Sequence, residues 1–150
     1  MFIPMELSRV LILDSSPEQF ITLSERGGGG RSFAIRIGTP EAVAIDRRLR
    51  GEPPPRPQTH ELIENVVAAL GAEIVRVEIH SLEGGTYFAN VVLAQGGREI
   101  AVDARPSDAV ALAVARRLPI EVDEQVLADS AEERPDVEPP VESDEDADDA

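Results

Sequence analysis

The chain has 150 residues, a length that suits one domain, and it carries a net charge of −15 with no cysteine. The lack of cysteine excludes disulfides, zinc–thiolate sites and a catalytic thiol. Aromatic residues are scarce, so the core must be built from aliphatic side chains. The N-terminus lacks the features of a signal peptide, and no apolar run reaches the roughly 20 residues that span a bilayer. We therefore expect a cytoplasmic protein that makes no membrane contact.

The negative charge is concentrated at the C-terminus. Residues 132–150 contain ten acids and one arginine, which gives −9 of the total and leaves −6 for the domain at 1–131. This tail has too few apolar residues to offset the cost of ordering, so we predict a disordered acidic tail. It would act as a solubilising appendage, or as a phosphate mimic that competes for a basic site. All 14 basic residues are arginine, so contact with a polyanion would depend on a few local side chains.

The first part of the chain, about 7–50, predicts three strands and a helix. Alternating apolar residues place the strands near 7–13, 20–24 and 32–37. Thr39-Pro40-Glu41 is typical of a helix start, and this helix should run to about Leu49. Arg47, Arg48 and Arg50 make its end polar.

A proline-rich loop at 51–57 leads into a further predicted helix. Thr59 is its expected N-cap and Glu61 lies in its first turn. Gly71 should end it. Its apolar stripe consists of Leu62, Ile63, Val66, Val67 and Leu70.

The part at about 74–118 repeats the same order. Strands are expected at 75–80, 87–94 and 99–104, and Pro106-Ser107-Asp108 then opens a helix that is apolar almost all round. Pro119 stops this helix. A short closing strand at Ile120 and Val122 follows, and a last helix should run from after Asp123 to about Ala131.

Shifting the sequence on itself by 67 residues aligns the two parts without a gap. The matched pairs include Gly30 with Gly97, Arg31 with Arg98, and Ala42 with Ala109. These matches predict a duplicated β-β-β-α unit. Hairpins followed by segregated helices indicate an α+β fold, with a mixed or antiparallel sheet and helices packed against it.

The segment Asp103-Ala104-Arg105-Pro106-Ser107-Asp108 joins a strand to a helix. Amide groups at the helix start and the Arg105 guanidinium could hold a phosphate. Asp103 and Asp108 could ligate a divalent cation. The same residues also suit an ordinary strand-to-helix junction, in which Arg105 pairs with one of the acids.

His60 lies at the start of the helix after the proline-rich loop, where it could transfer a proton near neutral pH. It could equally cap that helix or bond to a loop carbonyl. His60 and Glu64 share a helix face, so a weak metal site is conceivable there.

Several motifs, in order, resemble the bifunctional nuclease family between about Met5 and Ala131. They are Ile37-Gly38-Thr39-Pro40-Glu41-Ala42, Arg56-Pro57-Gln58-Thr59-His60-Glu61-Leu62, Gly85-Thr86-Tyr87-Phe88-Ala89, and Asp103-Ala104-Arg105-Pro106-Ser107-Asp108-Ala109. The resemblance implies a compact α+β fold, frequent self-association as a homo-oligomer such as a dimer, and cleavage of RNA and DNA by some members.

Two hypotheses follow. In the first, the protein is a nuclease that hydrolyses phosphodiester bonds in RNA or DNA. Its catalytic residues are His60, Asp103, Arg105 and Asp108, its substrate-binding residues Arg56, Thr59 and Ser107, and its ligands for a divalent cation such as Mg²⁺ are Glu41, Asp103 and Asp108. In the second, it is a non-catalytic oligomeric module that uses the same polar residues structurally, or to bind a small anion or a protein. An open cleft at His60 and Arg105 would favour the first.

Overall fold

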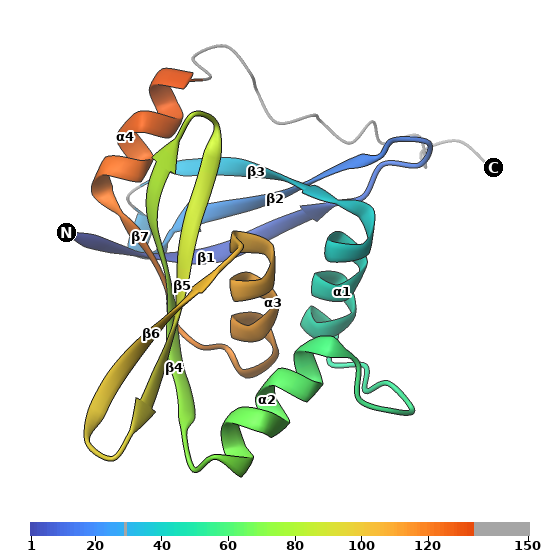
Figure 1. The fold of residues 1–150 in the computed structure, drawn as a ribbon. Coiled ribbons are helices and arrows are strands. Elements are labelled where there is room, and N and C mark those ends of the chain that lie inside the picture. The colour runs from blue at the N-terminus through green and yellow to red at the C-terminus, as the bar shows by residue number, and fades with distance from the viewer. Residues whose placement is uncertain (29, 134–150) are drawn as a thin grey trace.

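A seven-stranded mixed sheet and four α-helices make up the computed structural model, which describes residues 1–28 and 30–133 (Figure 1). The sheet order is β3-β2-β1-β7-β4-β5-β6. The strands are β1 (Phe2–Leu11), β2 (Glu18–Glu25), β3 (Ser32–Gly38), β4 (Glu73–Glu83), β5 (Thr86–Gln95), β6 (Arg98–Ala104) and β7 (Ile120–Asp123). The helices are α1 (Thr39–Leu49), α2 (Thr59–Ala69), α3 (Pro106–Arg116) and α4 (Glu124–Glu133), with a short 3₁₀ turn at Arg26–Gly28.

The short strand β7 joins the two halves of the sheet. It pairs antiparallel with β1 and parallel with β4, whereas the other strand pairs are antiparallel. The predicted α+β class is therefore confirmed. The order strand-strand-strand-helix occurs twice, and α1 and α3 correspond residue for residue at the predicted offset of 67. A duplication as the origin of this order stays a prediction.

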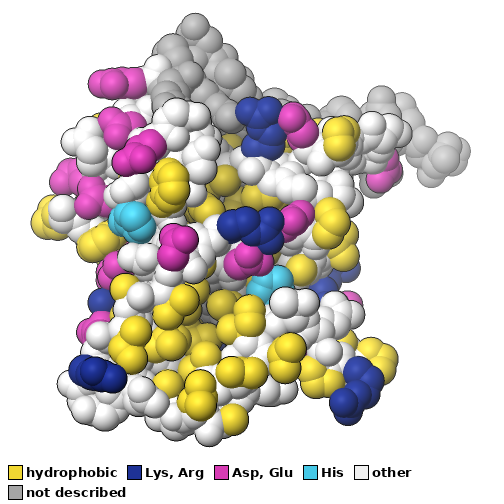
Figure 2. Space-filling model, in the orientation of Figure 1, with side chains coloured by type: hydrophobic (Ala, Val, Ile, Leu, Met, Phe, Trp, Pro, Cys, Tyr) yellow, Lys and Arg dark blue, Asp and Glu magenta, His cyan; other side chains and the backbone are white. Residues whose placement is uncertain are grey.

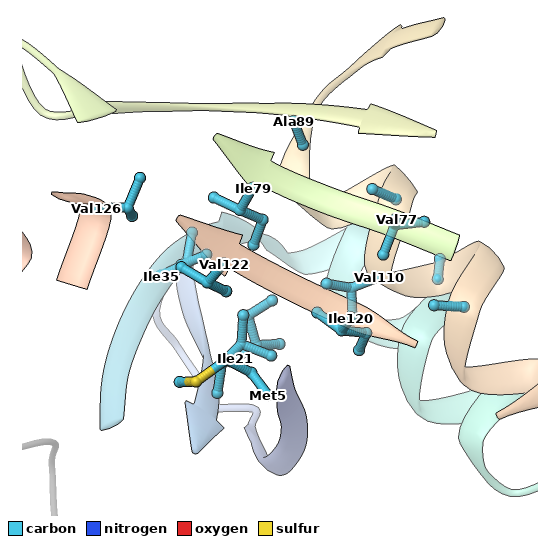
Figure 3. Close-up of a cluster of buried hydrophobic side chains, with 14 of the residues drawn as sticks. Met5, Ile21, Ile35, Val77, Ile79, Ala89, Val110, Ile120, Val122 and Val126 are labelled. Carbon is cyan, nitrogen blue, oxygen red and sulfur yellow. The ribbon is translucent and has the colours of Figure 1, made fainter. Parts of the chain in front are cut away.

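The core is aliphatic, as the composition requires. Ile79 of β4, Val122 of β7 and Val110 of α3 are fully buried, and Val126 of α4 closes the far end of the same cluster (Figure 3). Ala42 and Ile45 of α1 are buried as well, since α1 and α3 lie side by side over the sheet (Figure 1). Burial of this aliphatic surface is the main source of stability.

Two local predictions differ from the structure. The first strand begins at Phe2 instead of Leu7, because β7 from the other end of the chain pairs with Phe2–Met5. Thr59 is not the N-cap of α2: Gln58 holds that extended position and Thr59 is the first helical residue. A prediction from local sequence misses the first feature because the partner strand lies far along the chain.

Only part of the predicted apolar stripe of α2 faces the core. Ile63 and Val67 pack against it, whereas Leu62, Val66 and Leu70 are exposed. None of the helices described is long and apolar enough to cross a membrane. The predicted acidic tail falls almost entirely outside the described residues, so its disorder stays a prediction.

Candidate functional site

Three helices begin at one place on the surface. Glu41 lies in the first turn of α1, His60 is the second residue of α2, and Asp108 lies in the first turn of α3. Arg105 is the N-cap residue of α3. The unpaired amide groups at helix starts carry partial positive charge, which stabilises nearby carboxylates and can attract an anion.

The side chains of these four residues form one connected cluster, which we call the Arg105 group. Arg105 donates from Nε to Oδ2 of Asp108 at 2.9 Å and from Nη1 to Oε1 of Glu41 at 3.1 Å. The His60 Nε2 lies 3.0 Å from Oδ1 of Asp108. Charged side chains and a histidine gather in the middle of the face in Figure 2. The structure thus brings together residues that are 48 and 64 positions apart.

The absence of a side chain at Gly38 leaves space for the Glu41 carboxylate. A Cβ at Gly38 would collide with the Glu41 carboxylate, so this carboxylate lies directly over the glycine backbone. The matched position in the second unit is Arg105 itself. One helix start therefore lacks a side chain where the other carries the central guanidinium.

The electrostatics of the cluster keep its charges in place. Burial would raise the pKa of Asp108, but the hydrogen bonds from Arg105 and then His60 outweigh it and hold that pKa below its ordinary value. The bonds from Arg105 to Asp108 and Glu41 raise the pKa of the Arg105 guanidinium. Because Asp108 stays ionised and can only accept, neutral His60 must carry its proton on Nε2, which leaves Nδ1 with a free lone pair.

Arg105 borders three cavities. The first, about 270 Å³, is lined by Glu41, Thr59, His60 and Asp108 among others. The second, about 350 Å³, is lined by Ser107 at the start of α3 and by parts of β3 and the β4–β5 hairpin. The third, about 320 Å³, lies between α2 and the strands β4–β6. The Arg105 side chain is 64% exposed, so its remaining N–H groups can reach a ligand from solvent.

The predicted residues Asp103 and Arg56 form no hydrogen bond or ion pair with the cluster, although Asp103 lines the third cavity together with Arg105 and Asp108. Asp103 is exposed on β6 and finds no hydrogen-bond or ion-pair partner within residues 1–28 and 30–133. Strand alternation places its side chain on the sheet face opposite to that of Val102 and Ala104. Arg56 is exposed in the loop before α2 and likewise has no such partner in the described part of the chain.

The other two predicted contact residues lie beside the cluster. Thr59 lines two of the three cavities, and Ser107 is buried where α3 begins. Neither side chain makes a hydrogen bond with the residues that the structure describes.

The predicted metal ligands do not form a compact set. Among the described residues, no group of three or more acids or histidines is arranged to hold a metal ion. Glu41 and Asp108 both bind Arg105. Glu64, which could have shared a metal ion with His60, binds Arg48 and Arg116. The cation site therefore stays a prediction.

Arg48 is buried, whereas the sequence predicted a polar end of α1 at this residue. Arg48, with a side chain only 4% exposed, lies near the C-terminal end of α1, where a charged residue normally faces water. It donates to the Ala111 carbonyl of α3 at 2.7 Å, to Glu61 of α2 at 2.9 Å, and also to Glu64. Arg48 thus ties α2, and with it His60, to α1 and α3. In the sequence, the spacing of Glu61 and Glu64 at i, i+3 on α2 is the feature that could have indicated a cationic partner for this helix.

Comparison with known proteins places these features in a family. The family described as "Bifunctional nuclease domain" matches residues 21–135. An uncharacterized protein of Mycobacterium tuberculosis is 41% identical over 135 residues, which cover 90% of this chain and 77% of that protein. Bifunctional nuclease 1 of Oryza sativa subsp. indica is 28% identical over 79% of this chain, and bifunctional nuclease 1 of Arabidopsis thaliana is 27% identical over 73%. The chain spans only 37% and 34% of these two plant proteins.

Fold and site together define an α+β protein with a histidine–carboxylate–arginine cluster at the starts of its helices. The match over most of the chain gives the family as well. This chain belongs to the bifunctional nuclease domain family.

Proposed function

We propose that the protein is a nuclease that hydrolyses phosphodiester bonds in RNA or DNA at the Arg105 group. The observation that carries the proposal is the pairing of His60 with Asp108 beside the exposed Arg105. Family membership, and the names of the plant relatives, support the same activity.

Each residue of the cluster has a chemical role in this proposal. Arg105 binds a non-bridging phosphate oxygen through N–H groups that its two carboxylate partners leave free. Asp108 orients His60 and stabilises the imidazolium that forms. Nδ1 of His60 takes a proton from the attacking water, the new P–O bond forms, and the bond to the leaving oxygen breaks as that oxygen takes a proton from solvent.

The exposure of Arg105 supports this function over the closed structural module. The Arg105 side chain is 64% exposed and borders three cavities, whereas the His60 side chain is 12% exposed and lines the cavity of about 270 Å³. A divalent cation such as Mg²⁺ would need Glu41 or Asp108 as a ligand, in competition with Arg105. Activity measured with and without a chelator decides whether the cation belongs to the proposal.

Cleavage of a fluorescent oligonucleotide by purified variants tests the proposal. His60→Ala should lower the rate by about 10² to 10⁴, and Arg105→Ala should also remove most activity, while circular dichroism shows an intact fold. His80→Ala is the matched control, because the side chain of this second histidine bonds, among the residues that the structure describes, only to its neighbour Ser81. It should retain wild-type activity. Cleavage that persists in both His60→Ala and Arg105→Ala would overturn the proposal.

A further inference from the structure

The third cavity at Arg105 is hydrophobic along most of its length. It has a volume of about 320 Å³ and lies between α2, α3 and the sheet. Figure 2 shows hydrophobic side chains gathered below the charged cluster on this face. The aliphatic walls are Ile63, Val67, Ile74, Val91, Leu93, Val102 and Leu112. Its size lies at the lower end of the range of small-molecule pockets.

One end of this cavity is polar. Thr59, Asp103, Arg105 and Asp108 line it, and Thr59, Arg105 and Asp108 also line the cavity that holds His60. The Thr59 hydroxyl is free to donate or accept, since it has no hydrogen-bond partner within residues 1–28 and 30–133. A molecule with apolar faces and a polar edge therefore finds matching surfaces here.

We propose that this cavity is a base subsite: it holds one heterocyclic base of the strand whose phosphate binds Arg105. This inference rests on the proposed nuclease function and extends it. A base presents two apolar faces and a hydrogen-bonding edge, and it is linked to the phosphate through a single sugar. The base must leave its stack to enter, so the strand has to be unpaired at this nucleotide.

The edge strand β6 makes the cavity accessible. Val102 on this strand is 43% exposed, and in the sheet of the described residues β6 has a neighbouring strand on one side only. A side chain from a second copy of the protein is the competing occupant. The polar end at Thr59 and Arg105 favours the base, because an aliphatic side chain would leave the Thr59 hydroxyl and the remaining N–H groups of Arg105 without an acceptor or donor.

A binding experiment tests the base subsite. The probes are a labelled single-stranded phosphorothioate hexanucleotide and an abasic hexamer with the same backbone, measured by fluorescence anisotropy. The wild type should bind the base-bearing probe about tenfold more tightly. Val102→Trp fills the cavity and should remove this preference while leaving abasic binding unchanged.

Val43→Trp is the matched control, since Val43 is 51% exposed on α1 and lines none of the three cavities. It should behave as the wild type. Leu93→Phe fills the same cavity from β5 and replaces Val102→Trp if that variant fails to fold. Equal affinity of the wild type for both probes would overturn the inference. A second outcome would also overturn it: Val102→Trp binds both probes as the wild type does, but light scattering shows a changed molecular mass. The cavity would then belong to a contact between two copies of the protein.

The two proposals can fail separately. Preference for the base-bearing probe without cleavage of the corresponding phosphodiester would leave the subsite standing and remove the nuclease proposal. Cleavage by the wild type without any preference for the base-bearing probe would leave the nuclease proposal standing and remove the base subsite.

Discussion

The two strand-strand-strand-helix units begin their helices in the same way and supply different chemistry there. Glu41 and Asp108 occupy matching positions in the first turns of α1 and α3, and both accept a hydrogen bond from Arg105. Arg105 belongs to the second unit, and its counterpart in the first is Gly38. A near-symmetric frame thus holds one guanidinium between two carboxylates, and only the carboxylate of the second unit also binds His60.

The far ends of the units differ as well. Arg48 of α1 is buried and tied to α2, while the matching residue of α3 is Ala115. The outer strand β3 has neighbours in α4, whereas β6 is largely exposed along its length. The difference teaches that the buried arginine that binds α2 belongs to the first unit, whereas the exposed guanidinium of the site belongs to the second.

The largest expected effect comes from replacing Arg48 of the first unit with alanine, the residue at the matching position 115 of the second unit. Arg48→Ala leaves Glu61 and Glu64 partly buried without this partner and the Ala111 carbonyl without its donor. It should lower the free energy of unfolding by about 3 kcal/mol. Urea denaturation measures this loss. Arg50→Ala is the control, because Arg50 is 64% exposed and its side chain pairs, within the described part of the chain, only with Asp46; it should cost about 0.5 kcal/mol or less.

The next effect separates the two carboxylates. Asp108→Asn disturbs both His60 and Arg105, so the cleavage rate should fall by about 10² to 10⁴. Glu41→Gln removes only the second anchor of Arg105, and the rate should fall by about tenfold or less. Initial rates on one labelled oligonucleotide measure both. Equal losses would mean that the two units contribute equally to the site.

A smaller effect concerns the stability of the protein at acidic pH. The pKa of Asp108 lies lower in the folded protein than its unfolded value of about 3.9, so its stabilising contribution is complete above that value. This contribution is lost as the pH falls through the folded pKa. Between pH 5 and pH 3 the wild type should therefore lose more unfolding free energy than Asp108→Asn. Urea denaturation at both pH values measures the difference, and parallel losses would contradict the prediction.

The smallest effect tests the glycine of the first unit. Gly38→Ala keeps a backbone conformation that alanine adopts freely, but its Cβ displaces the Glu41 carboxylate. The loss of the bond to Arg105 should cost about 0.5 kcal/mol. In a Glu41→Gln background the same substitution should cost less, which a double-mutant cycle measures. An unchanged cost would show that the glycine does not act through Glu41.

Local patterns in the sequence predict the helix starts well. Pro40 and Pro106, each followed within two residues by an acid, mark the two helices that begin at Thr39 and Pro106. The partners of the side chains, in contrast, cannot be predicted from local patterns. Arg105 finds Glu41 across 64 positions and His60 finds Asp108 across 48, and neither contact leaves a local signal. The burial of Arg48 is hidden for the same reason, since its acidic partners belong to another helix.

The place of β7 has a consequence for how the molecule opens. This four-residue strand is the only link in the described sheet between β1 and β4, and Val122 within it is fully buried. Loss of β7 would expose apolar surface on both sides and leave two separate three-stranded sheets. Amide hydrogens of β1 and β4 that bond to β7 should therefore exchange with solvent in one cooperative opening, at a rate set by the residues at 120–123.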